Sequence, residues 1–106
     1  MKILIVEDDL VIAESLANEL KNWNYDVKLA KQFSHILDDF KSYLPDLVLL
    51  DINLPTLNGF HWCQEIRKIS NVPIIFISSR TDNMDQIMAI QMGGDDFIEK
   101  PFNLSL

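Results

Sequence analysis

The chain has 106 residues, which suits one domain with a single hydrophobic core. Hydrophobic residues make up 48% and charged residues 24%, as in an ordinary globular protein, and no apolar run reaches the roughly 20 residues of a membrane-spanning helix. Sixteen acidic against nine basic residues give a net charge of −7, which argues against binding of a nucleic-acid backbone by this chain itself. The only cysteine, Cys63, cannot form an internal disulfide, which fits the cytoplasmic location that we expect. The absence of a long apolar run is the reason why we expect no membrane segment.

Five short apolar runs recur along the chain, and three of them are continuous rather than alternating. Continuous apolar runs are typical of parallel strands that helices cover on both faces. The first run follows a basic start, but acidic residues come next and no cleavage site appears, so it is interpreted as a strand and not as a signal peptide. The predicted strands are residues 3–6, 25–30, 47–50, 74–77 and 96–98.

Segments with helical periodicity separate these runs, and the predicted helices are residues 13–20, 33–40, 60–69 and 83–92. Asp8 or Asp9 can cap the first helix, and Ser34 lies near the start of the second. Because strands and helices alternate, we predict an α/β fold with an open parallel sheet and right-handed crossovers. A fifth helix should cover one face of the sheet, but it has barely begun when the chain ends, so we expect it to be truncated or absent here.

Polar side chains directly follow four of the five predicted strands. Because the carboxyl ends of parallel strands meet at one edge of the sheet, and ligands of open α/β sheets bind there, these side chains should converge on one cleft. The converging residues are Glu7, Asp8 and Asp9 after the first strand, Asp51 after the third, Ser78 and Ser79 after the fourth, and Lys100 after the fifth.

Carboxylates that are brought together repel one another unless a cation lies among them. Mg²⁺ suits such a site, since it takes one or two carboxylates together with waters and substrate oxygens. A carboxylate beside Mg²⁺ can attack a phosphoryl group and form an acyl phosphate. Lys100 and the Ser78 hydroxyl would then neutralise charge on the transferred group. The pattern therefore predicts phosphoryl chemistry at Asp51.

Four blocks carry a resemblance to a known family, namely "ILIVEDD", "LVLLDINLP…NG", "IIFISSR" and "GGDDFIEKPF". In this order and spacing they resemble the signature blocks of bacterial two-component response-regulator receiver domains. The ending "DDFIEKPF" resembles the winged-helix (OmpR/PhoB-like) branch, and "GFHWCQEIRKISNVPIIFISSR" resembles Gram-positive regulators of cell-envelope stress and antimicrobial peptides. The resemblance implies a flavodoxin-like (CheY-like) doubly wound sheet of five parallel strands in the order 2-1-3-4-5.

The resemblance also implies roles for residues at the acidic edge. Asp51 matches the phosphoacceptor of receiver domains. The implied Mg²⁺ ligands are Glu7, Asp8, Asp51 and the backbone carbonyl of Asn53. Glu7 would act largely through water, and Asp8 would be the main carboxylate ligand besides Asp51.

The remaining implied residues concern the phosphoryl group and the switch. Ser78 matches the switch hydroxyl, and Lys100 matches the ammonium that receiver domains carry after the fifth strand. Phe97 matches the aromatic rotamer switch, where Tyr is commoner in relatives. A cis peptide bond is implied between Lys100 and Pro101, which the imide geometry of proline allows.

The expected function follows from these matches. A sensor histidine kinase would donate a phosphoryl group to Asp51, and the new charge would draw Ser78, Lys100 and Phe97 inward. The face of the fourth helix and fifth strand would then change shape and support a homodimer. We expect residues 1–106 to be the receiver domain of a transcription regulator whose DNA-binding domain follows downstream. Such a receiver assists its own phosphorylation but is no multiple-turnover enzyme on an external substrate.

Three other functions fit parts of the pattern. An aspartyl-nucleophile phosphatase would need a second acid two positions after Asp51, and that position is Asn53. A flavodoxin-like FMN carrier would need a phosphate-binding loop after the first strand, where "EDD" would repel phosphate. A non-phosphorylated interaction domain would not need the complete set of acids, hydroxyl and lysine.

Several residues that could suggest other chemistry are interpreted as structural. His35 and His61 follow no predicted strand, so we expect surface or helix-packing roles rather than phosphohistidine or metal chemistry. Cys63 has no companion ligand and is expected to be a partly buried apolar residue. Trp23 and Trp62 are expected to be packing anchors.

Overall fold

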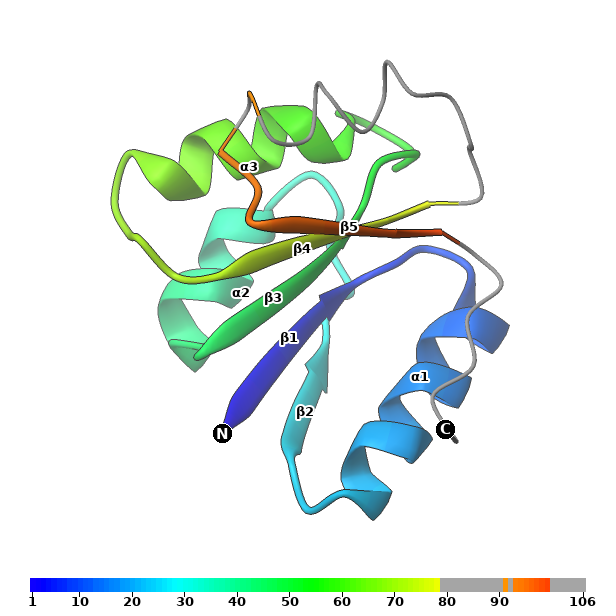
Figure 1. Cartoon of the computed structure of the whole chain (residues 1–106). Coiled ribbons are helices and arrows are strands. Elements are labelled where there is room, and N and C mark those ends of the chain that lie inside the picture. Colours follow the sequence, from blue (N-terminus) through cyan, green and yellow to red (C-terminus); the bar gives the residue numbers. More distant parts are fainter. Residues whose placement is uncertain (79–90, 92, 100–106) are drawn as a thin grey trace.

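A computed structural model describes residues 1–78, 91 and 93–99, and of residues 97–99 it describes the backbone. Strands and helices alternate through most of this part of the chain, so the predicted α/β class is confirmed (Figure 1). The elements are β1 (Lys2–Val6), α1 (Leu10–Asn22), β2 (Asp26–Leu29), α2 (Ile36–Tyr43), β3 (Leu47–Asp51), α3 (Gly59–Arg67), β4 (Ile74–Ser78) and β5 (Asp96–Glu99). The predicted helix over 83–92 and the expected last helix lie outside the described residues.

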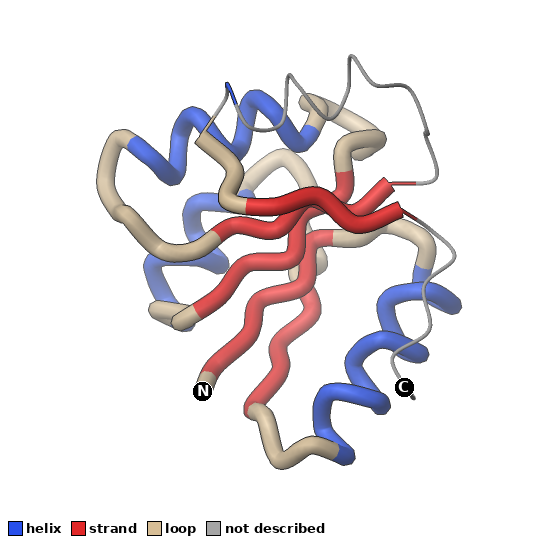
Figure 2. The backbone as a smooth tube through the Cα atoms, in the orientation of Figure 1, coloured by secondary structure: helices blue, strands red, loops and turns tan. Residues whose placement is uncertain are grey.

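The strands form one parallel sheet with the order β2-β1-β3-β4-β5, which is the order that the resemblance implied. Figure 2 shows the strands side by side with helices on both faces. α1 covers one face, while α2 and α3 cover the other (Figure 1). The strand order reverses between β1 and β3, which is where open α/β sheets place their sites.

Side chains of β1 alternate between two separate hydrophobic cores. Ile3 and Ile5 pack in the core beneath α1, whereas Leu4 and Val6 pack in the larger core beneath α2 and α3. All four are essentially buried. Because successive side chains of a strand point to opposite faces, a strand that is buried on both faces must be apolar throughout.

The helix boundaries differ in places from the predicted ones. α2 begins at Ile36 rather than at residue 33, and its N-cap residue His35 makes no side-chain cap bond, so Ser34 does not cap it. Phe33 lies in the preceding loop, where its carbonyl accepts a hydrogen bond from the Thr56 hydroxyl at 2.8 Å. The loop before α2 also has a backbone bond from the His35 N–H to the Gln32 carbonyl at 2.9 Å, so its backbone makes turn and long-range contacts in place of helical ones.

The expectations for the isolated aromatic and thiol residues have mixed outcomes. Trp62 is buried in the core, as predicted for a packing anchor. Cys63 is fully buried rather than partly buried as predicted, and burial raises the pKa of its thiol. Trp23 was predicted to be a packing anchor, and this is wrong. It is 61% exposed, because it lies at the C-cap of α1, beyond the buried face of that helix.

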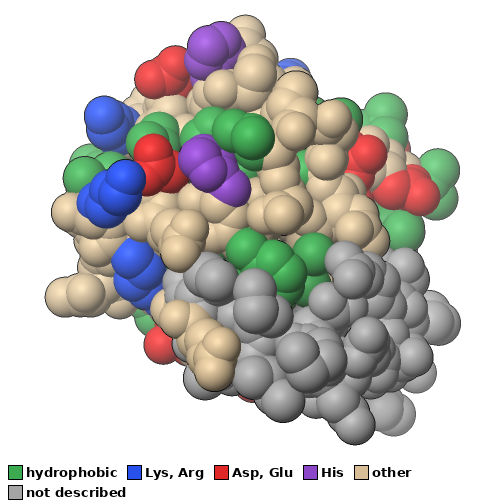
Figure 3. Space-filling model, turned by 90° about the horizontal axis from the view of Figure 1, so that it is seen from above, with side chains coloured by type: hydrophobic (Ala, Val, Ile, Leu, Met, Phe, Trp, Pro, Cys, Tyr) green, Lys and Arg blue, Asp and Glu red, His purple; other side chains and the backbone are tan. Residues whose placement is uncertain are grey.

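None of the helices in the described ranges is long and apolar enough to span a bilayer. Histidine side chains lie apart on the surface that Figure 3 shows, rather than in a cluster. His35 is exposed, and the His61 ring contacts the Trp62 ring edge-on with 4.9 Å between centroids. These positions agree with the expected surface and helix-packing roles.

Candidate functional site

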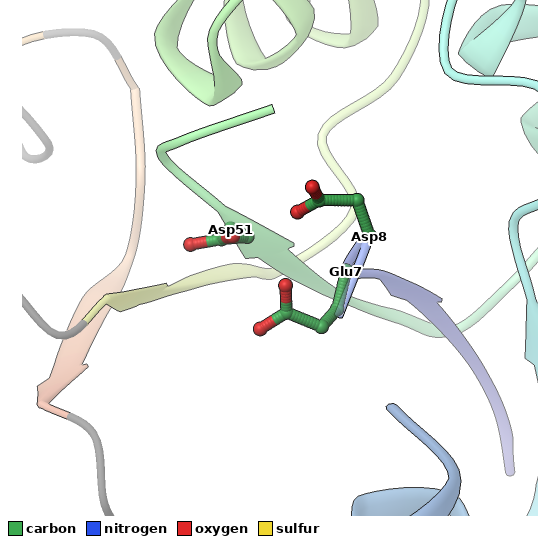
Figure 4. A group of neighbouring side chains, drawn as sticks. All are labelled: Glu7, Asp8 and Asp51. Carbon is green, nitrogen blue, oxygen red and sulfur yellow. The ribbon is translucent and has the colours of Figure 1, made fainter. Parts of the chain in front are cut away.

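Three carboxylates meet at the carboxyl edge of the sheet. Glu7 and Asp8 follow β1, and Asp51 ends the neighbouring strand β3. One carboxylate oxygen from each residue lies within 4.8 Å of one from each of the others. Figure 4 shows the three side chains around a common space. The structure therefore brings together three of the four residues that were expected to bind a metal ion.

The pairing of β1 with β3 explains why these acids meet. Val6 pairs with Leu50 in the parallel register, so the next residues along the two strands, Glu7 and Asp51, emerge beside each other. Both strands are buried on both faces, which leaves the register little freedom to slip. Glu7 and Asp51 are each 4% exposed, whereas Asp8 is exposed to solvent.

Asp8 and Asp9 are adjacent acids with different structural roles. The Asp9 carboxylate accepts hydrogen bonds from the backbone N–H groups of Val11 at 3.1 Å and Ile12 at 3.3 Å, which makes Asp9 the N-cap of α1. The backbone N–H of Asp9 donates to the Glu7 carboxylate at 3.2 Å and so helps to orient it. The sequence left open which acid caps the helix, and the structure assigns the cap to Asp9 and places Asp8 in the acidic cluster.

Ser78 lies at the same edge of the sheet. It ends β4 and is fully buried, and it follows Ile77, the residue that pairs with Asp51. Asn53 lies two residues beyond Asp51 in the β3–α3 loop. Both residues are thus placed at the carboxyl ends of the central strands, in agreement with their predicted neighbourhood. Their predicted roles are not tested by this placement.

The remaining predicted site residues lie outside what the structure describes. Lys100 and Pro101 fall beyond the described ranges, so the ammonium group and the cis bond stay predictions. The backbone of Phe97 belongs to β5 and pairs with Phe76, but its side chain is not described. The proposed aromatic switch therefore also stays a prediction.

The β3–α3 loop is fixed at several points that sequence reasoning missed. The Ile52 carbonyl accepts hydrogen bonds from the backbone N–H groups of Leu54 at 3.2 Å and Gly59 at 2.8 Å. The Thr56 hydroxyl bonds to the carbonyl of Phe33, 23 residues away. A lone Thr in a polar loop gives no sequence signal for such a bond. Asn58 and Gly59 belong to one of the quoted signature blocks, but their local sequence does not predict the bond from the Gly59 N–H to Ile52.

The donor set of the acidic cluster fits a hard divalent cation. Three like charges at this spacing repel one another, and a cation among them lowers that cost. All three donors are carboxylate oxygens, which Mg²⁺ prefers, and the exposed Asp8 leaves one side accessible to water ligands. The cluster is typical of the Mg²⁺ site of receiver domains.

Comparison with known protein families shows which family the chain belongs to. The model of the response regulator receiver domain matches residues 3–106, so the chain belongs to this family and has its CheY-like α/β fold. The family comprises regulatory domains of two-component systems rather than enzymes acting on an external substrate. The predicted membership is confirmed, and it implies a cognate histidine kinase as partner.

Relatives of known name support the finer resemblance. The uncharacterized transcriptional regulatory protein YvcP of Bacillus subtilis is 56% identical over 105 residues, covering 99% of this chain and 44% of that protein. Response regulator protein GraR of Staphylococcus aureus is 45% identical over 102 residues, covering 96% and 46%. The chain thus spans about half the length of the curated relatives it matches.

A solved structure gives the same indication. The N-terminal domain of the nisin resistance regulator NsrR, a lantibiotic response regulator, superimposes with a TM-score of 0.89 and 49% identity. The match covers 98% of this chain and 88% of that one. The predicted likeness to Gram-positive regulators of envelope stress and antimicrobial peptides is confirmed at the level of similarity.

Proposed function

We propose that Asp51 accepts a phosphoryl group from a sensor histidine kinase in a Mg²⁺-dependent reaction. The observation that carries the proposal is the meeting of Glu7, Asp8 and Asp51 at the carboxyl edge of a receiver-domain sheet. Asp51 ends the buried strand β3, so the backbone that presents its carboxylate is held by the core on both faces. A rigidly held nucleophile lowers the entropic cost of reaching the phosphorus atom.

The residues that would hold Mg²⁺ are Glu7, Asp8, Asp51 and the backbone carbonyl of Asn53. When bound, Mg²⁺ would neutralise charge on the phosphoryl oxygens and between the clustered carboxylates. The exposure of Asp8 supports direct access of the ion from solvent. Glu7, which is buried and accepts a hydrogen bond from the Asp9 N–H, would act on Mg²⁺ largely through water.

In the proposed transfer, an Asp51 carboxylate oxygen forms a bond to phosphorus while the bond between phosphorus and the kinase histidine breaks. The imidazole leaves with the electron pair of that bond and takes up a proton. We propose that Ser78, which is buried at the end of the neighbouring strand, donates a hydrogen bond from its hydroxyl to the transferred group. We propose that Lys100 provides a compensating positive charge and that Phe97 follows Ser78 inward.

We propose that the output is transcriptional and acts through more chain than is present here. Support comes from YvcP, described as a transcriptional regulatory protein, of which this chain matches 44%. A DNA-binding domain downstream of residue 106 would provide the DNA contacts, in keeping with the net charge of −7 on this chain. Phosphorylation would favour a homodimer through the fourth helix and fifth strand, in the cytoplasm where the kinase transfers its phosphoryl group.

Acetyl phosphate with Mg²⁺ tests the phosphoacceptor directly. The wild-type chain should gain the mass of one phosphoryl group in intact-protein mass spectrometry, and Asp51→Ala should gain none. Chelation of Mg²⁺ with EDTA should prevent labelling of the wild-type chain. Equal labelling of Asp51→Ala and wild type would reject Asp51 as the acceptor. Asp9→Ala is the matched control, because Asp9 is an adjacent acid that caps α1, and it should label like the wild type.

A further inference from the structure

The first residue of α3 packs against the backbone of Asp51. A Cβ atom on Gly59 would lie well inside 3.0 Å of the Asp51 carbonyl oxygen, a separation that real Cβ atoms essentially never show. It would also lie 3.0 Å from the Asp51 carbonyl carbon and 3.1 Å from the Ile52 Cα. All three neighbours are main-chain atoms, which cannot rotate away as a flexible side chain can. Any larger residue at this position must therefore move either α3 or the end of β3.

Neither element can move freely. α3 is anchored by Trp62, Cys63 and Ile66, all buried in the core beneath the sheet. The residue before Asp51, Leu50, is fully buried in the same core. Interiors are close-packed, so moving the whole helix would disturb many contacts. The strain of an added Cβ would therefore fall on the junction between the Asp51 backbone and the start of α3.

Two hydrogen bonds keep this approach close, one between backbone groups and one from a backbone N–H to a side chain. The Gly59 N–H donates to the Ile52 carbonyl at 2.8 Å, which draws the start of α3 onto the residue next to Asp51. Asn58 caps the helix, its side-chain oxygen accepting from the His61 N–H at 3.0 Å. Gly59 does not have a positive φ angle. Glycine is therefore needed at this position because there is no space for a Cβ atom, and not because the backbone is left-handed.

We propose that Gly59 is a positioning residue for Asp51. Its missing side chain allows α3 to seat on the Asp51 carbonyl and so sets the distance between the Asp51 carboxylate and those of Glu7 and Asp8. The proposal rests on the proposed function, because it concerns the same phosphoacceptor. A shift of roughly 1 Å in a reacting group can cost about two orders of magnitude in rate. Gly59→Ala should therefore impair the site more than the fold.

Gly93 provides a matched control for the substitution. It has a φ of +97°, and an added Cβ would meet the Arg67 side chain at 3.0 Å rather than main-chain atoms. It precedes β5 and so lies toward the amino end of the sheet, opposite to the acidic cluster. Gly93→Ala should therefore strain the fold without touching the site, since L residues rarely adopt this φ.

The test compares the two alanine variants with the wild-type chain. Circular dichroism and urea unfolding establish that each variant is folded at 25 °C. Isothermal titration calorimetry then measures the Mg²⁺ dissociation constant, and mass spectrometry follows labelling by acetyl phosphate at saturating Mg²⁺. Gly59→Ala should weaken Mg²⁺ binding about fivefold or more and slow labelling about tenfold or more. Gly93→Ala should keep both values within about twofold of the wild type, because its strain lies away from the site.

The outcomes separate the two proposals. If the wild-type chain is labelled, Asp51→Ala is not, and Gly59→Ala matches Gly93→Ala in both measurements, the positioning role is overturned while the phosphoacceptor stands. If Asp51→Ala is labelled like the wild type, the phosphoacceptor proposal fails instead. If Gly59→Ala does not fold, the positioning role of Gly59 can be tested by NMR of the wild-type chain. Addition of Mg²⁺ should then shift the Gly59 amide resonance and leave that of Gly93 in place, and an unmoved Gly59 resonance would overturn the proposal.

Discussion

The two ends of the sheet use acidic residues in opposite ways. At the carboxyl edge, Glu7, Asp8 and Asp51 bring three like charges within 4.8 Å of one another. Toward the amino edge, the Asp95 carboxylate is paired with the Arg67 guanidinium at 2.9 Å and also accepts from the Ile74 N–H at 2.8 Å. The first arrangement gathers three carboxylates whose donor set fits a cation, and the second joins separate segments of the fold through one carboxylate. The contrast shows that the same side-chain chemistry serves two purposes, depending on the groups that the fold places beside it.

The amino-edge network extends beyond a single ion pair. The Arg67 side chain also donates to the backbone carbonyls of Gly93 at 2.8 Å and Val72 at 2.6 Å. It thereby joins the end of α3, the start of β4 and the segment that leads into β5. Its side chain is only 21% exposed, so these bonds are largely shielded from water. Bonds of this kind contribute more than those of exposed ion pairs.

The largest expected effect comes from breaking this network. Arg67→Ala should lower the free energy of unfolding by about 3 kcal/mol, because the Gly93 and Val72 carbonyls lose their side-chain donor and the Asp95 carboxylate keeps only the Ile74 N–H. Urea unfolding measures the loss. Lys68→Ala is the control: Lys68 pairs with Glu65 at the surface with 72% of its side chain exposed, so it should cost no more than about 0.5 kcal/mol. Equal losses in the two variants would contradict the special role of the network.

The next effect separates the adjacent acids Asp8 and Asp9. Asp9→Ala should lower the free energy of unfolding by about 1 kcal/mol, because the helix cap is lost. Asp8→Asn should not lower it in the absence of Mg²⁺, because removal of one like charge relieves repulsion in the cluster. A ligand present at ten times its dissociation constant stabilises the folded state by about 1.4 kcal/mol.

Unfolding with and without Mg²⁺ gives the measurement for this pair. The wild type and Asp9→Ala should gain stability with Mg²⁺, and Asp8→Asn should gain much less. A full Mg²⁺ response in Asp8→Asn would remove Asp8 from the proposed ligands. A loss of response in Asp9→Ala would show that the cap and the cluster are not separable, which would weaken the contrast between structural and functional acids.

The smallest effect appears only at alkaline pH, at the end of α2. Burial raises the pKa of Tyr43 from 10.0 to about 12, and the carboxylates of Asp26 and Asp46 add to the shift. The folded state therefore holds the phenolic proton more tightly than the unfolded state does. The resulting linkage leaves stability unaffected below about pH 10 and lowers it as the pH rises from 10 toward 12. The carboxylates near Tyr43 thus disfavour the negatively charged phenolate, just as the carboxylates of the acidic cluster disfavour one another.

Tyr43→Phe tests this linkage. The variant should lose less stability than the wild type between pH 10 and 11.5 in urea unfolding, because it has no proton to release. Absorbance at 295 nm should show that the step assigned to Tyr43 is missing in the variant. Parallel loss of stability in the two proteins would indicate that the Tyr43 phenol ionises equally readily in the folded and unfolded states.

The position of the acidic cluster could be predicted from the sequence because each acid directly follows an apolar strand. Glu7 and Asp51 are 44 residues apart in the sequence, but parallel pairing of their strands brings them together at one edge of the sheet. The division of labour between Asp8 and Asp9 could not be predicted. The two residues are chemically identical, and only the path of the chain into α1 decides which carboxylate reaches the helix N–H groups.

Other features depended on contacts between distant residues. The start of α2 was misplaced because Phe33 has helical spacing but lies in a loop, where its carbonyl bonds to the distant Thr56. The close packing of Gly59 on Asp51 was missed, since a local pattern shows a turn but not what lies against it. Hydrophobic periodicity predicts which face of a helix or strand is apolar. It does not predict which other element packs against that face, and both of these features depend on such packing.

The burial of the Asp51 carboxylate has a consequence for how phosphodonors are told apart. Asp51 is 4% exposed, whereas Asp8 beside it is exposed to solvent, so under the proposed function a phosphodonor would approach Asp51 from the side of Asp8. If Asp51 is the acceptor, contacts that distinguish one phosphodonor from another would form mainly with residues around this buried side chain. Donor specificity could then change without any change in the chemistry at Asp51.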